Sequence, residues 1–143
     1  MSADLGTTMS THRTRSTLLS CWLAVGCSSS VPAPGVEAVD SASGALHVVA
    51  RTVPNPPTRG TIEVDLEITD SATGSPRDGL TLAVTPWMPS MDHGTSLVPT
   101  VAPQGQGLYD VTNVDLFMSG TWDLNLAVSG PLLDNAVLQF SIP

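Results

Sequence analysis

The sequence predicts one small all-β domain, an immunoglobulin-like β-sandwich of about seven short strands, behind a signal peptide and a flexible tether. Three observations support this prediction. Several short runs alternate apolar and polar residues, turns rich in Gly and Pro separate the runs, and none of helical length repeats every 3.6 residues. With 143 residues the chain is long enough for one core. A small open barrel is the alternative arrangement of the same strands.

The first half of the domain contains three predicted strands. The clearest is Thr61 to Thr69, in which four aliphatic residues alternate with three acids, so that the acids face solvent. A run rich in β-forming residues, Ala45 to Val53, precedes it and ends at a proline cluster that excludes further pairing. After the turn signal SATGSPRDG, Leu80 to Thr85 is the third strand.

The second half repeats this rhythm. Its predicted strands are Ser96 to Val101, Leu108 to Val114, Thr121 to Ser129 and Val137 to Ile142. Trp122 begins an inward-facing row, and we expect it to anchor the core. His47, in the first strand of the domain, is expected to be an ordinary strand residue. The Asp-Gly pair at 78–79 and the Asp-Asn pair at 134–135 predict turns.

The N-terminal region predicts export. Two arginines precede an apolar run of ten residues, Thr17 to Gly26, which is too short to span a bilayer but suits a signal peptide. The tetrapeptide ending at Cys27 resembles the bacterial lipobox, whose cysteine is lipidated and becomes the mature N-terminus. We therefore expect a lipoprotein signal peptide at residues 1–26, with Met1 or Met9 as the start.

Residues 27–44 are expected to form the lipidated cysteine and a flexible linker, because they are small and proline-rich without apolar periodicity. The domain itself is expected at residues 45–143. In bacterial lipoproteins a serine after the lipidated cysteine usually permits transfer to the outer membrane, and Ser28 holds that place here. We expect a lipid-anchored protein of the cell envelope that faces the periplasm, with the outer membrane favoured over the inner.

Composition excludes several functions. Without residues 1–26 the chain has 12 acidic residues against 3 arginines, a charge of −9, which disfavours nucleic acid as a partner. The chain has no lysine, and lipidation of Cys27 would leave no thiolate, so Schiff-base, P-loop and blue-copper chemistry are excluded. His47 and His93 alone cannot supply a three-histidine zinc site. We expect no enzyme activity.

One segment, Thr85 to Ser96, carries the candidate chemistry. It places Met88, Met91 and His93 within six residues in a predicted loop. Two thioethers and an imidazole suit Cu(I) better than zinc or calcium. Met118 becomes a fourth candidate ligand if a bulge in its strand turns it toward this loop. The alternative for all three methionines is ordinary packing in the core or at one end of the sandwich.

The segment WMPSMDHG, followed by GLYDVTNVDLFMSGTWDLNLAV, resembles the YtkA-like domain family, which is related to the FixH accessory proteins of respiratory-oxidase assembly. In that family a Met-Pro-x-Met-x-His-Gly segment precedes a Gly-x-Tyr strand and a Met-x-Gly-x-Trp strand. The matching residues here are Gly107 and Tyr109, then Met118, Gly120 and Trp122. The resemblance implies an immunoglobulin-like extracytoplasmic domain, often near copper-handling or oxidase-assembly systems, without an established enzyme activity.

Three functions remain open at this point. The leading hypothesis is a lipid-anchored domain that binds or delivers Cu(I) through Met88, Met91 and His93, with Met118 as a further ligand. The second is a metal-free interaction or assembly module that docks a cell-envelope protein through a sheet face or an edge strand. The third is a small hydrolase, which requires a second acid or base close to His93. The sequence leaves the oligomeric state open.

Overall fold

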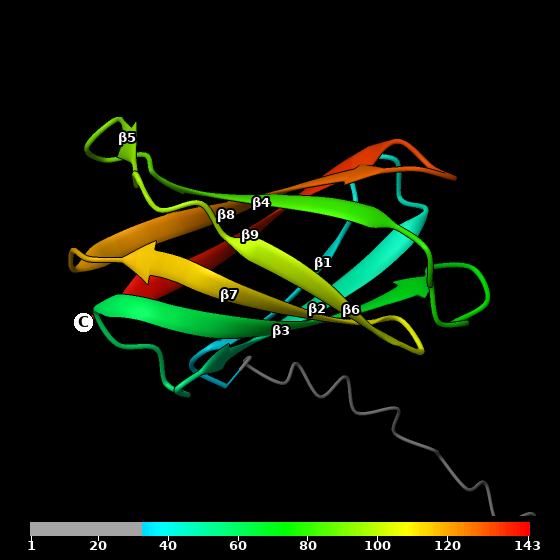
Figure 1. Cartoon of the computed structure of the whole chain (residues 1–143), viewed down its shortest axis with the longest axis horizontal. Helices are drawn as coiled ribbons and strands as arrows, with labels where there is room; N and C mark the ends of the chain where they lie inside the picture. Colours follow the sequence, from blue (N-terminus) through cyan, green and yellow to red (C-terminus); the bar gives the residue numbers. More distant parts are fainter. Residues whose placement is uncertain (1–32) are drawn as a thin grey trace, which may run out of the picture. The chain divides into compact units, whose positions relative to one another are not determined.

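The computed structural model describes residues 33–143, so the predicted signal peptide and Cys27 lie outside the described residues. Every regular element in this range is a β-strand (Figure 1). The strands are β1 (Val36–Asp40), β2 (Leu46–Val53), β3 (Gly60–Asp70), β4 (Thr81–Met88), β5 (His93–Gly94), β6 (Thr100–Gly105), β7 (Leu108–Leu116), β8 (Gly120–Ser129) and β9 (Asp134–Ile142). This part of the chain offers no helical membrane span.

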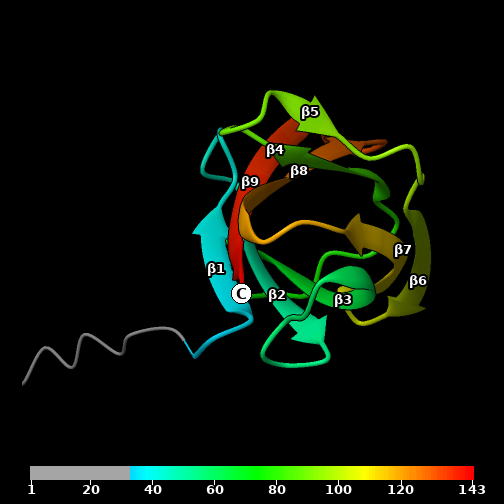
Figure 2. The same ribbon diagram turned by 90° about the vertical axis from the view of Figure 1, so that its left-hand side faces the viewer.

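The strands form two antiparallel sheets. Sheet A has the order β1-β2-β3-β7-β6, and sheet B has the order β5-β4-β8-β9. Viewed along the strands, the two sheets enclose one core, and β1 of sheet A contacts β9 of sheet B (Figure 2). The predicted all-β sandwich is therefore confirmed.

The inward rows of both sheets fill the core. In β3 the four aliphatic residues are buried and the three acids between them, Glu63, Asp65 and Glu67, are exposed, as the alternation predicts. Trp122 of β8 is fully buried and is the largest side chain of the core, so its predicted role as core anchor is confirmed. Tyr109 of β7 is the next largest fully buried side chain.

The predicted linker, residues 27–44, was too long at its C-terminal end. Val36–Asp40 forms β1, which pairs with β2 so that Val39 lies opposite Val48. A strand of five residues at a sheet edge needs few buried side chains, and the small and proline-rich residues around it hide its weak alternation. The predicted strand Ser96 to Val101 was also misplaced, because β6 begins only at Thr100.

The two ends of the sandwich differ in character. We call one the polar end, formed by residues 41–45, 71–80, 105–107 and 130–133. We call the other the site end, formed by residues 88–94 and 117–119. Both ends consist mainly of the turns at which the chain passes from one strand to the next.

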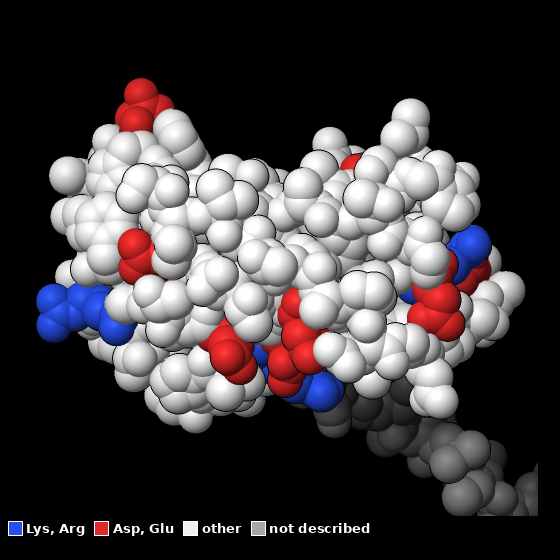
Figure 3. Space-filling view, in the orientation of Figure 1, with Lys and Arg blue, Asp and Glu red and all other residues white. Residues whose placement is uncertain are grey.

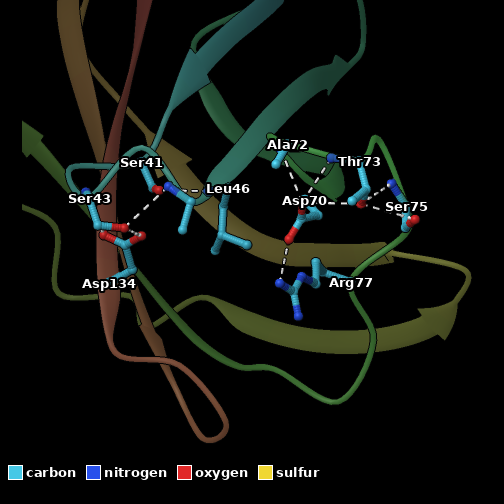
Figure 4. A network of polar contacts seen from close by, with 10 residues as sticks. Ser41, Ser43, Leu46, Asp70, Ala72, Thr73, Ser75, Arg77 and Asp134 are labelled. Carbon is cyan, nitrogen blue, oxygen red and sulfur yellow. Dashed lines mark hydrogen bonds and ion pairs between the residues drawn. The ribbon is translucent and has the colours of Figure 1, made fainter.

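At the polar end, Asp70 closes the turn after β3. Its carboxylate accepts the backbone N–H groups of Ala72 and Thr73, each at 3.0 Å, and pairs with Arg77 (Figure 4). The Arg77 guanidinium, helped by these contacts, holds the pKa of Asp70 below its usual value. The turn is therefore fixed by its own side chains.

Asp134 ties β9 to the turn between β1 and β2. Its two carboxylate oxygens accept the N–H of Ser43 at 3.1 Å and the Ser43 hydroxyl at 2.5 Å (Figure 4). Hydrogen bonding to the Ser41 and Ser43 hydroxyls lowers the pKa of Asp134 to about 2. The predicted turn at 134–135 was wrong, because Asp134 already belongs to β9.

Candidate functional site

Most of the segment predicted as a loop, Thr85 to Ser96, is strand and tight turn. β4 continues to Met88, which lies directly opposite His93 of β5. The N–H of Met91 donates to the Met88 carbonyl at 3.1 Å and closes the turn between the two strands. Pro86 is tolerated inside β4 because β5 pairs only with the last two residues of that strand.

Met88 and His93 share the inner face of sheet B, because directly opposed residues of antiparallel strands point to the same side. On the other flank of β4, Trp87 pairs with Asp123 of β8, which places Met88 next to Trp122. The Met88 side chain is only 2% exposed. The structure therefore sets Met88 between His93 and Trp122 at the edge of the core.

Gly120 makes room for Met88. A Cβ at Gly120 would lie 2.6 Å from the methyl carbon of Met88, and the residue also has a φ of +130°, which L side chains rarely adopt. The methionine therefore fills the space above the first residue of β8. Gly120 is the glycine of the Met-x-Gly-x-Trp strand named above. Its lack of a side chain leaves room for the Met88 methyl group.

The His93 ring is held by three contacts. It stacks on Phe117 with centroids 5.6 Å apart at 19°, and it meets Trp122 edge-on at 6.1 Å and 76°. Its Nδ1 lies 2.9 Å from the carbonyl oxygen of Gly94. Since a carbonyl only accepts, Nδ1 carries the hydrogen, and in the neutral form of the ring the lone pair then lies on Nε2. The orientation of the ring is thus fixed, and Nε2 has no hydrogen-bond partner in the described part of the chain.

The two remaining candidate ligands lie on the turns between β4 and β5 and between β7 and β8. Met118, on the turn between β7 and β8, is half-buried and packs against the core, and its carbonyl accepts the Trp122 indole N–H at 2.9 Å. Met91, in the turn before His93, is 54% exposed. The four predicted ligands therefore belong to one end of the domain, at different depths.

Phe117 was missed by the sequence reasoning. It is 45% exposed and contacts both His93 and Trp122, the latter at a centroid distance of 5.5 Å. Its only signal in the sequence is its position directly before Met118. A contact between segments so far apart in the chain leaves no periodic pattern in the sequence from which it could be predicted.

The other candidate residues lie elsewhere. His47 of β2 is half-buried, and its Nδ1 pairs with Asp40 of β1 at 2.8 Å, in keeping with an ordinary strand residue. Within residues 33–143, no three side chains of the His, Cys, Asp or Glu type gather as a metal site. The candidate site at the site end differs in kind, because most of its donors are thioethers.

Comparison with known proteins identifies the family. No curated protein and no solved structure matches the chain significantly. The model of the YtkA-like family matches residues 40–127, from the end of β1 through most of β8. This match covers more than half of the chain and includes all four candidate ligands and the residues that hold them. The chain therefore belongs to the YtkA-like family.

Proposed function

We propose that the domain is a lipid-anchored, extracytoplasmic Cu(I)-binding domain and not an enzyme. Membership of the YtkA-like family suggests a domain outside the cytoplasm. The observation that carries the copper proposal is the cross-strand pair of Met88 and His93, in which the imidazole is fixed by the Gly94 carbonyl with Nε2 left for a ligand. Cys27 is the proposed site of lipidation, and the periplasmic side of the outer membrane the proposed location.

The donor set suits a soft, monovalent ion. Thioether sulfur and imidazole nitrogen both bind Cu(I) well, whereas zinc and calcium favour harder or anionic ligands. A histidine that ligates a metal nearly always donates its other N–H to a carbonyl or carboxylate, as His93 does to Gly94. In this proposal His93 supplies the nitrogen and the three methionines of the site end supply sulfur.

The methionines would act at different depths. Met88 is buried against Trp122 and would form the floor of the site, while Met118 would approach from the adjoining turn. Met91 is the exposed member, and a thioether in solvent can bind or release an ion without opening the core. This gradient of exposure favours exchange of the ion over permanent storage.

The ring contacts of His93 argue against hydrolysis. In a Ser-His-Asp triad a carboxylate accepts the second N–H of the general base and stabilises the charged ring. Here Nδ1 faces the neutral carbonyl of Gly94. That arrangement orients the ring for a ligand on Nε2 and places a carbonyl where a catalytic triad has a carboxylate.

The test is a competition titration of the full chain with Cu(I) against a chromophoric chelator. For this experiment both cysteines are replaced, as Cys21→Ser and Cys27→Ser, so that no thiolate binds the copper ion. We expect one equivalent of copper to be retained, and Met91→Ala combined with His93→Ala to weaken retention by more than about 100-fold. His47→Ala is the matched control and should retain copper normally. If the double variant retained copper as well as the parent chain does, Met91 and His93 would not form the copper site.

A metal-free docking module is the second candidate. The observation that favours it is β6, an edge strand of sheet A whose residues are almost all exposed, so that it offers unpaired backbone groups to another strand. The same titration separates the two candidates. A docking module predicts that no copper is retained by the parent chain, and that the double variant changes at most its stability.

A further inference from the structure

Exposed apolar side chains lie on the segments just before and after His93 and on Phe117, which stacks on its ring. Eight large apolar residues in the described part of the chain are well exposed, and half of them come from the segments around this ring. They are Met91 (54% exposed), Leu97 (40%), Val98 (77%) and Phe117 (45%). We call this group the apolar rim. Exposed apolar groups concentrated around one site commonly mark a contact surface.

The rim is held in place by hydrogen bonds. The Thr95 hydroxyl donates to Asp115 at 3.3 Å, and the N–H of Leu97 donates to the Thr95 hydroxyl oxygen at 3.1 Å. These contacts tie the segment after β5 to the end of β7, two residues before Phe117, which itself stacks on His93. Two segments more than fifteen residues apart are thus joined beside the proposed copper site.

The charges of the domain limit which kind of partner can bind at the apolar rim. Asp92 and Asp115 flank it, Arg59 lies near the start of β3 at the same end, and the domain as a whole carries −9. In Figure 3 the charged groups lie along the lower part of the molecule and at its two ends, and the surface over β4 is largely uncharged. A second copy of this domain would bring another −9 and is disfavoured by repulsion, as is an anionic membrane. A positively charged partner is attracted.

We propose that the apolar rim docks a positively charged protein that carries or accepts Cu(I) through its own soft ligands. The proposal rests on the proposed function, because it names the partner of that same site. Transfer is a ligand exchange: one copper–sulfur bond to the donor breaks as one to the exposed thioether of Met91 forms. Copper stays Cu(I), and neither an electron nor a proton moves. Apolar contact at the rim excludes water from this exchange.

Two synthetic peptides serve as copper donors in the test. Both contain the same two methionines and the same apolar residues, but one has four lysines where the other has four glutamates, so their copper ligands are identical. Stopped-flow mixing with the full chain measures the rate of Cu(I) transfer. We expect the lysine peptide to transfer at least about ten-fold faster at low salt, and the advantage to shrink as salt rises.

Substitutions in the apolar rim test the docking of the donor separately from the binding of copper. Leu97→Ser with Val98→Ser should slow transfer from the lysine peptide about ten-fold and leave retention in the chelator titration unchanged, since neither side chain is a proposed ligand. The control is Leu133→Ser with Val137→Ser, two exposed residues outside the rim, which should transfer at the parent rate.

Each other outcome overturns the inference. If the parent retains copper but the two peptides transfer equally fast, or the rim variant keeps the parent rate, the docking surface is wrong and the copper site stands. If the parent retains no copper, the proposed function fails as well. Sedimentation that shows a dimer lost in the rim variant would assign the rim to a second copy. Flotation with phosphatidylcholine vesicles that depends on the rim would assign it to lipid.

Discussion

At one end of the sandwich carboxylates close the turns, and at the other end aromatic rings and methionines pack against one another. Asp70 and Asp134 satisfy backbone N–H and hydroxyl groups of the polar end, and their pKa values fall in consequence. At the site end, His93, Phe117 and Trp122 are mutual neighbours, and the imidazole keeps one nitrogen without a protein partner in the described structure.

This difference separates stability from binding. The hydrogen bonds of the polar end are already satisfied and leave little for a ligand to gain. The site end presents soft donors and exposed apolar surface, which gain from a ligand or a partner. Substitutions at the polar end should therefore change stability or its pH dependence alone, whereas those at the site end should change copper retention as well.

The largest effect is expected at the one residue that serves both the core and the site. Trp122→Ala removes the largest buried side chain and leaves a cavity, which should lower the free energy of unfolding by about 3–5 kcal/mol. It also removes the edge contact to His93, so copper retention should fall. Urea unfolding followed by far-UV circular dichroism measures the first effect. A cost below about 1 kcal/mol would mean that the indole is not packed as described.

Gly120→Ala tests the contact with Met88. The new Cβ meets the Met88 methyl group and forces a positive φ on alanine, so we expect a loss of about 1–3 kcal/mol and weaker Cu(I) retention. The matched control is Gly74→Ala at the polar end, where φ is +70° but no atom lies within 4 Å of the Cβ. The control should lose stability and keep copper. Equal copper retention in both variants would refute a role for Met88.

Tyr109→Phe tests the polar end. The Tyr109 hydroxyl donates to the Arg77 carbonyl at 2.8 Å and accepts the N–H of Leu80 at 3.3 Å. Its removal leaves both groups without this partner and should cost about 1–2 kcal/mol in urea unfolding. Copper retention should equal that of the parent. A loss of copper in this variant would show that the polar end also affects copper binding.

The smallest effect concerns pH. Asp134 has a pKa of about 2 in the folded protein and about 3.9 when unfolded, so its contribution to stability is complete above about pH 4 and is lost as pH falls toward 2. Asp134→Asn should flatten the dependence of unfolding free energy on pH in this window. Asp123→Asn on the outer face of sheet B is the control. Identical profiles for parent and Asp134→Asn would contradict the assignment.

The sequence predicted what local periodicity encodes. The alternation in β3 and the inward row from Trp122 follow from residues within one strand, and both are confirmed. β1 and β5 were missed because five and two residues at sheet edges are too few to establish a period of two. The segment Thr85 to Ser96 was predicted as a loop, but β4 continues through Pro86 to Met88, because β5 pairs only with the last two residues of that strand.

The candidate site shows the same limit. Met88, Met91 and His93 were found by their spacing, and Met118 was added on the expectation of a bulge in its strand. Sequence could not tell which sulfur is buried, since that depends on how β4 pairs with β5 and β8. Nor could it find the stacking of Phe117 on His93, which joins segments 24 residues apart.

We propose that sulfur from the site end, together with His93, holds Cu(I), and the methionine methyl groups report on this binding. The full chain, with both cysteines replaced by serine, is labelled with ¹³C at the methionine methyl groups, and its spectrum is recorded with and without one equivalent of Cu(I). We predict that the signals of Met88, Met91 and Met118 shift, while those of Met1 and Met9 stay in place. Shifts confined to Met1 and Met9, or no shift at all, would show that these methionines and His93 do not bind Cu(I).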